Sequence, residues 1–305
     1  GSPIHIWRPD GEEQFKNALM TTATINGRAH TLVLLGYGTH SYAQDPGALL
    51  AYDIDYSLTE PIWKHTIRID ETPPSYQERG LGTDGFNTHI IQAADIFPSE
   101  PGVEIIAAWI HLPTAAACLR IYTPDGRQLH QLWHDGPWQS IHWLPGPRRL
   151  VISTLKSTVK WKDFGIAHER ADKDPVVMFA ITPVLGEIAD DWCSMAPGDG
   201  PFASHWYLWF PPIVLEDCGT ISVIPPNPGE ADPARWYLVQ YPLLDGRGSF
   251  TWLFDEDGQV APDSFVPNNK YRTFSDHPDP EDYLPAPLEE IIERYAGGDR
   301  TELKE

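Results

Sequence analysis

The chain has 305 residues, of which 22 are Lys or Arg and 43 are Asp or Glu, so its formal net charge is -21. Because proteins bind nucleic acid by neutralising phosphates with Lys and Arg, this charge argues against a nucleic-acid partner and against anionic membranes. No apolar run approaches the roughly 20 residues that a membrane-spanning helix needs, and the cysteines Cys118, Cys193 and Cys218 lack metal-ligand spacing.

The chain opens with a segment that returns later in the sequence. "IWRPDGEEQFK" from Ile6 carries the same Pro-Asp-Gly turn as "IYTPDGRQLHQLW", residues 121–133. Residues 4–16 are therefore predicted to form a β-hairpin, and its recurrence indicates a repeat protein. The leading Gly1-Ser2 pair is typical of a cloning scar, which is compatible with the trimming of a native targeting segment or anchor. The expected location is extracytoplasmic (periplasmic, secreted, or the ectodomain of an anchored protein).

A hairpin that ends in tryptophan recurs along the chain. The repeats are "LLAYDIDYSLTEPIW" to Trp63, "LRIYTPDGRQLHQLW" to Trp133, "VMFAITPVLGEIADDW" to Trp192 and "LVQYPLLDGRGSFTW" to Trp252. An apolar strand precedes each hairpin ("TLVLLGYG", "VEIIAAW", "RRLVISTL", "TISVI"), and a further strand precedes three of these ("THIIQAADI", "SIHWLPG", "SHWYLWF"). Four strands in each repeat predict an all-β fold, a β-propeller.

We expect five four-stranded blades in a single domain, residues 1–305. The N-terminal hairpin would supply the two outer strands of the last blade and so close the ring. Residues 276–305 are expected to pack on the propeller as an extended tail with a short amphipathic helix that carries Leu288, Ile291, Ile292 and Tyr295 on one side.

The tryptophan-ended hairpins resemble the repeats of quinoprotein-like (PQQ-like) propellers, in which the tryptophan wedges between neighbouring blades. "HIIQAADIFPSEPGVEIIAAW" is similar to an FG-GAP (integrin-type) repeat but keeps only Asp95 and Glu104 of the acidic turn, so calcium is not expected. Neither resemblance implies a quinone cofactor or a catalytic residue. The tryptophans are interpreted as inter-blade packing, and Trp133 should be almost fully buried.

The long connections point to the functional face. In a propeller the loops between the second and third strands, and those between blades, emerge on one face. Here they are long, running from Arg68 to Phe86, from Lys156 to Asp174 and from Pro225 to Arg235, whereas the other loops are as short as "NGR" and "LPGPR". Long loops in compact domains are usually functional, so the ligand is expected on that face.

Three histidines are candidates for a metal site at the channel mouth: His89, His142 and His205 each lie near the start of a predicted innermost strand. Converging imidazoles can bind a divalent transition metal, and the arrangement resembles, by position only, propeller polysaccharide lyases of the oligogalacturonate type. The alternative is that these histidines cap strand ends through hydrogen bonds to the backbone.

The candidate ligand-binding residues combine aromatic rings with a basic loop: Trp109, His111, Trp143, Lys160, Lys162, Arg170 and Trp206. A basic loop on an acidic protein favours an anionic ligand such as a uronate. The leading hypothesis is a non-catalytic binding or sensing propeller for a carbohydrate or protein ligand. The alternative is a metal-assisted lyase or glycoside hydrolase acting on an acidic sugar.

Overall fold

The computed structural model describes residues 14–38, 47–57, 59–74, 85–111, 116–154, 177–192, 205–209, 220–224, 236–242, 249–254, 257, 266–268 and 286–287. This part of the chain is all-β: its regular structure is strands and one short 3-10 helix, η1 (Ile69–Glu71). The chain divides into two compact units. The first unit comprises residues 1–134 and 184–192, and the second comprises 135–183 and 193–305. The prediction of one propeller domain remains a prediction.

Sheet A is an antiparallel meander in chain order. Its strands are β1 (Gln14–Ile25), β2 (Arg28–Gly38), β3 (Ala48–Asp53) and β4 (Trp63–His65). Asn26 and Gly27, with φ of 49° and 75°, form the two-residue turn between β1 and β2, as Asn-Gly does in tight hairpins. Residues 14–16, assigned from the sequence to an outer hairpin, instead begin β1. Residues 4–13 of that hairpin lie outside the described part.

Sheet B repeats this meander and adds a strand from later in the chain. Its consecutive strands are β5 (Asn87–Ala94), β6 (Glu104–Ile110), β7 (Ala116–Tyr122) and β8 (Gln128–Asp135). The fifth strand, β12 (Ile188–Trp192), pairs with β8 in parallel, with Ile188 opposite Gln131 and Trp192 opposite Trp133. The predicted hairpin that ends at Trp192 is therefore wrong, because β12 leaves β11 and joins an earlier sheet.

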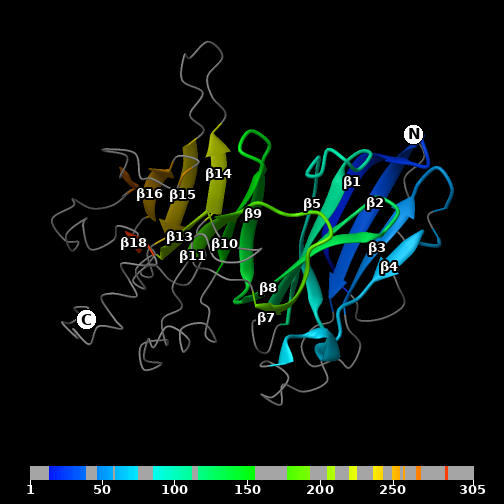
Figure 1. Cartoon of the computed structure of the whole chain (residues 1–305), viewed down its shortest axis with the longest axis horizontal. Helices are drawn as coiled ribbons and strands as arrows, with labels where there is room; N and C mark the ends of the chain where they lie inside the picture. Colours follow the sequence, from blue (N-terminus) through cyan, green and yellow to red (C-terminus); the bar gives the residue numbers. More distant parts are fainter. Residues whose placement is uncertain are drawn as a thin grey trace, which may run out of the picture. The chain divides into compact units, whose positions relative to one another are not determined.

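Sheets A and B pack on each other within the first unit (Figure 1), where β5 lies against β1 and β2. The approach is close: a Cβ on Gly36 of β2 would lie 2.9 Å from the Thr88 Cγ2 atom. From β4, the Trp63 indole N–H donates to the Pro124 carbonyl at 2.9 Å, and His65 stacks on Tyr122 with 4.4 Å between ring centroids. Trp133 is fully buried against Phe86, as predicted.

The second unit contains two further sheets. Sheet C has the order β18-β13-β11-β10-β9, with β9 (Trp138–Leu144), β10 (Arg149–Thr154), β11 (Val177–Ile181), β13 (Trp206–Trp209) and β18 (Ala286–Pro287). Sheet D is the meander β14 (Thr220–Ile224), β15 (Trp236–Pro242), β16 (Ser249–Phe254) and β17 (Val266–Asn268). The predicted hairpin that ends with Trp252 is confirmed as β15 and β16.

Sheet C departs from the predicted repeats at β13. The sequence pattern assigned "SHWYLWF" to the innermost strand of the next blade, but β13 pairs with β11 and takes the position predicted for β12. None of the four sheets closes on itself within the described residues, so the structure gives a β-sheet-rich, repeat-like fold without confirming five blades. The predicted helix around residues 288–295 lies outside those residues, although Ala286 and Pro287 just before it pair with β13.

A β-bulge lies near the start of the first strand of three sheets. The register shifts between Phe15 and Asn17 in β1, between Thr88 and Ile90 in β5, and opposite Ser153 and Thr154 in β9. The extra residues are Lys16, His89 and Gln139, all polar. Because bulges are specific features that re-aim side chains, their shared position is consistent with a repeat-like fold.

Candidate functional site

The structure describes only some of the candidate ligand residues. Lys160, Lys162 and Arg170 lie outside the described part of the chain. Trp206 begins β13, where only its backbone is described. Trp143 in β9 is half-buried, and it is the one predicted ligand residue with a described, partly accessible side chain.

Trp109 and His111 lie in the interior instead of at a ligand-binding rim. Both side chains have 0% exposure, and His111 packs against Phe86 with 5.4 Å between ring centroids. Every residue of β6 is buried, because both faces of sheet B are covered. In this structure neither side chain is available to stack on a surface ligand.

His89 is the extra residue of the β5 bulge and is half-buried. Its backbone carbonyl accepts a hydrogen bond from the Asn17 side-chain amide on β1. His89 therefore lies where the first strands of sheets A and B approach each other, at the start of its strand as the sequence predicted.

His205 lies at the other end of its sheet from the predicted ligand loop. Its backbone N–H donates to Ala180 at the end of β11, the end that also carries the turn between β9 and β10. The segment after Lys156 instead connects Thr154 to Val177 at the opposite end. His205 was expected on the face of the long loops, but β13 pairs with β11 and places His205 at the other end of the sheet from Thr154 and Val177. The loop itself lies outside the described residues.

A three-histidine metal site remains a prediction. His142 pairs with Val151 in sheet C, and β9 and β13 are separated by β10 and β11, which places His142 and His205 three strand spacings apart, roughly 14 Å. His89 belongs to the first unit and the other two histidines to the second. Within the described ranges, no group of three or more His, Cys, Asp or Glu side chains could hold a metal ion.

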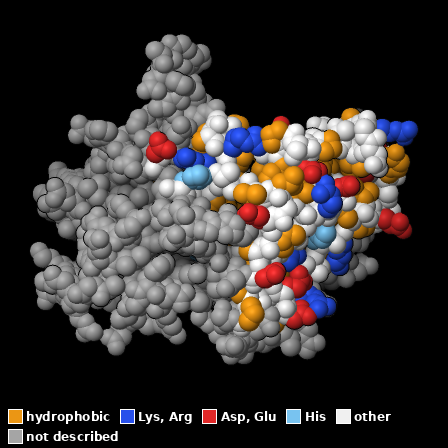
Figure 2. All heavy atoms as spheres, viewed as in Figure 1, with side chains coloured by type: hydrophobic (Ala, Val, Ile, Leu, Met, Phe, Trp, Pro, Cys, Tyr) orange, Lys and Arg blue, Asp and Glu red, His pale blue; other side chains and the backbone are white. Residues whose placement is uncertain are grey.

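The turn end of sheet C gathers polar side chains from separate segments. We call Arg149, Thr182, His205 and Asp257 the sheet C end cluster. The Thr182 hydroxyl lies 2.5 Å from the His205 Nε2 atom, and the Arg149 Nη1 atom lies 3.2 Å from the Asp257 Oδ1 atom. In Figure 2, a histidine lies beside basic and acidic side chains on the exposed surface. Thr182, His205 and Asp257 are exposed.

The surroundings of His205 favour the neutral form of its imidazole. The pKa of His205 is lowered, first by partial burial and then by the positive charge of Arg149, although Asp257 acts to raise it. A neutral imidazole offers one hydrogen-bond donor and one acceptor, beside a guanidinium and a hydroxyl group. The cluster can therefore exchange hydrogen bonds with sugar hydroxyl groups and attract a carboxylate.

Trp143 and Arg148 extend the same end of sheet C. Arg148 has φ of 57° in the turn after β9, and its guanidinium carbon lies 5.9 Å from the centroid of the Trp143 ring, within cation–π range. Trp143 pairs with Leu150, whereas His142 pairs with Val151, so Trp143 and His142 occupy opposite faces of the sheet. Sequence reasoning missed Arg148, Arg149, Thr182 and Asp257; the adjacent arginines at a hairpin turn of an acidic chain were the available signal.

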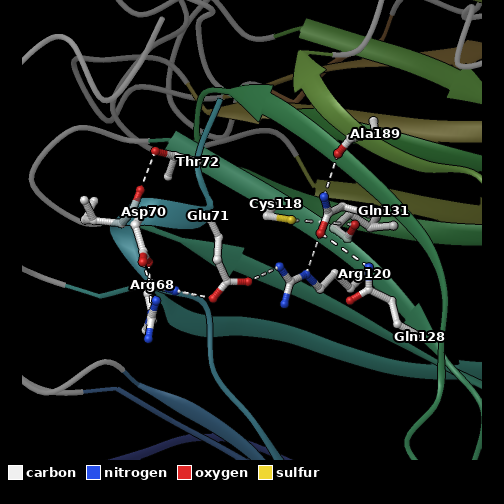
Figure 3. A network of polar contacts seen from close by, with 11 residues as sticks. Arg68, Asp70, Glu71, Thr72, Cys118, Arg120, Gln128, Gln131 and Ala189 are labelled. Atoms are coloured by element: carbon white, nitrogen blue, oxygen red, sulfur yellow. Dashed lines mark hydrogen bonds and ion pairs between the residues drawn. The ribbon is translucent and has the colours of Figure 1, made fainter. Parts of the chain in front are cut away.

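A buried polar network links η1 to sheet B (Figure 3). The Arg120 guanidinium donates to Gln131 Oε1 and to Glu71 Oε2, both at 2.8 Å, and the Gln131 amide donates to the Ala189 carbonyl at 2.6 Å. Burial raises the pKa of the neighbouring Cys118 thiol to about 12, although Arg120 acts to lower it. A protonated, buried thiol is not a nucleophile. The hydrogen bonds of this network join η1 to strands of sheet B, so we assign the network a structural role.

The FG-GAP-like turn also uses its carboxylate structurally. The Glu104 Oε2 atom accepts hydrogen bonds from the backbone N–H groups of Ile96 at 2.6 Å and Phe97 at 3.1 Å. Burial raises the pKa of Glu104, although these N–H groups and others act to lower it. The carboxylate thus holds the turn that follows β5.

Comparison with known proteins assigns no family: no family model, no curated protein and no solved structure matches the chain. Within the ranges that the structure describes, no helix is long and apolar enough to cross a membrane.

Proposed function

We propose that the chain is a non-catalytic, extracytoplasmic β-propeller that binds a carbohydrate or protein ligand, with an acidic oligosaccharide as the first candidate. The observation that carries this proposal is the sheet C end cluster. Arg149, Thr182, His205 and Asp257 come from four separate segments of the second unit, and three of them are exposed. Convergence of polar groups from separate segments is typical of binding sites on rigid scaffolds.

The propeller part of the proposal rests on sheet A, which is apolar on both faces. Leu32, Leu34 and Ala51 are buried on the face that also carries Gly36, whereas Leu50 and Tyr52 form a second cluster with Val33 and Leu35. A sheet with two apolar faces needs a layer on each side. Every blade of a propeller is flanked in this way, and the shared bulges of β1, β5 and β9 support the same repeat relationship.

The ligand class follows from the charge of the cluster. Arg149 is paired with Asp257, and the adjacent Arg148 adds a second positive charge at the same turn of a chain whose net charge is -21, so a carboxylate-bearing ligand is attracted locally. His205 and Thr182 supply donors and acceptors for hydroxyl groups. These groups fit a uronate-containing oligosaccharide better than a neutral apolar molecule.

Titration with oligogalacturonate, followed by calorimetry, tests the proposal. Arg149→Ala and His205→Ala should each weaken binding at least tenfold. Arg127→Ala is the matched control, because Arg127 also pairs with a carboxylate, Glu100, at 2.5 Å and is 60% exposed; this variant should bind like the parent. Equal affinities for all variants would remove the sheet C end cluster as the site. Elemental analysis of the same protein addresses the metal-assisted lyase alternative.

A further inference from the structure

A second interaction surface lies at the outer edge of sheet B, in the first unit. β12 is the last strand of this sheet, and within the described residues no strand pairs with its outer edge. An exposed strand edge presents backbone N–H and C=O groups to an incoming strand. We propose that this edge binds an extended, basic peptide segment of a partner protein by strand addition.

The inner edge of β12 is fixed, which leaves the outer edge preformed. The Gln131 backbone N–H donates to the Glu187 carbonyl at 3.1 Å, and the Gly186 N–H donates to the Leu129 carbonyl at 2.8 Å. In a parallel ladder, the residue opposite Gln131 directs its own backbone groups to the other side. That residue is Ile188, so its N–H and C=O point to the outer edge.

The side chains beside this edge combine apolar surface with negative charge. Val184, Leu185 and Ile188 are 42%, 40% and 48% exposed. Residues 184–192 contain Glu187, Asp190 and Asp191 and no Lys or Arg, and Asp190 is exposed. Apolar contacts and main-chain hydrogen bonds are how strand-addition sites obtain affinity and specificity.

The negative charge beside this edge favours a basic partner over a second copy of the chain. Two copies of this edge would place the exposed Asp190 near its counterpart, and like charges across paired strands are destabilising. A strand with alternating basic and apolar residues meets both features of the surface. Acidic residues at an edge also protect sheets from aggregation, and the experiment below separates that role from binding.

The test uses the full chain and a capped peptide of alternating lysine and valine. Titration of the 15N-labelled protein should give saturable shifts that are largest at the amides of Gly186 to Asp190. An otherwise identical peptide with N-methylated backbone amides should fail to bind, because it lacks the donors for strand pairing. A peptide with glutamate in place of lysine should fail because of its charge.

Two variants complete the experiment. Asp190→Lys should weaken binding of the lysine peptide at least tenfold, whereas Glu60→Lys, an equal charge change at an exposed residue between β3 and β4, should leave it unchanged. The proposal is overturned if the N-methylated peptide binds equally well, if both variants lose affinity equally, or if no saturable binding occurs, in which case the edge acidity only prevents aggregation. The outcome does not depend on the sheet C end cluster, which lies in the other unit.

Discussion

Two arginine–carboxylate pairs, one in each unit, differ in burial, and we therefore assign them different roles. In the first unit Arg120 and Glu71 approach to 2.8 Å, with side-chain exposures of 8% and 37%. In the second unit Arg149 and Asp257 approach to 3.2 Å, with exposures of 19% and 72%. The Arg120 guanidinium bridges Gln131 and Glu71. The Arg149 guanidinium lies beside exposed groups that a ligand could contact.

This difference shows how to separate structural from functional polar residues in this chain. A buried pair costs much stability when one partner is removed, because a desolvated group is left behind. A pair in which one partner is largely exposed, as Asp257 is, contributes less to stability, because water and salt screen it. The buried groups of sheet B should therefore govern stability, and the sheet C end cluster should govern ligand affinity.

The largest expected effect is on the packing within the first unit. Trp133→Ala should lower the free energy of unfolding by about 3–5 kcal/mol, because it empties a fully buried site. Trp143→Ala, at a half-buried position of β9, is the control and should cost clearly less. Denaturant unfolding measures both, and equal losses would contradict the division between the regions.

The two arginines provide the second test. Arg120→Ala should cost about 1–3 kcal/mol, because it leaves the buried Gln131 side-chain oxygen without its charged donor. Arg149→Ala should cost less than about 1 kcal/mol. The measurement is again denaturant unfolding, and a larger loss for Arg149→Ala would reverse the comparison.

The third test uses pH. Burial lowers the pKa of His130 to about 4, although its hydrogen bond with Val184 acts to raise it. Between pH 4 and the unfolded value near 6.5, the unfolded chain binds a proton that the folded chain does not, so this group removes stability as the pH falls through that range. His130→Gln should make the free energy of unfolding less dependent on pH between about 6.5 and 4. An unchanged slope would show that His130 is not buried.

The smallest effect concerns the contact of Trp63 with the turn between β7 and β8. Gly126 has φ of 91°, and an added Cβ would lie 2.7 Å from the Trp63 Cγ atom, whereas Gly27 has φ of 75° with nothing within 4 Å. Gly27→Ala should cost about 1 kcal/mol through backbone strain alone. Gly126→Ala should cost more, because Trp63 must also move. Equal melting shifts would mean that Trp63 does not pack there.

The sequence predicted local features of the fold better than distant ones. Alternating apolar residues around Pro-Asp-Gly predicted the β7–β8 hairpin, and "DGRGSFTW" marked the end of the β15–β16 hairpin. The parallel pairing of β12 with β8 joins Ile188 to Gln131 across many residues, and no local pattern specifies such a partner. Because the hairpin ending at Trp192 was predicted wrongly, β13 was assigned to the wrong sheet, and His205 was expected at the wrong end of its strand pair.

Sequence reasoning also failed to predict which of the candidate side chains are buried. Trp109 lies near the end of an apolar strand, and such a position can lie either at a ligand-binding rim or in the core. Trp109 is in the core because both faces of sheet B are covered. Arg120 stands in the otherwise apolar run "ACLRIY". A charged residue within a strand that is buried on both faces indicates a buried network, and this signal could have been recognised.

The central claim is that stability and binding are divided between the two arginines. Unfolding and oligogalacturonate titration should be measured on the same preparations of Arg120→Ala and Arg149→Ala. The account predicts that Arg120→Ala loses about 1–3 kcal/mol of stability while its folded fraction binds like the parent. It predicts that Arg149→Ala loses less than about 1 kcal/mol but binds at least tenfold more weakly. Loss of affinity in Arg120→Ala with unchanged binding by Arg149→Ala would contradict it.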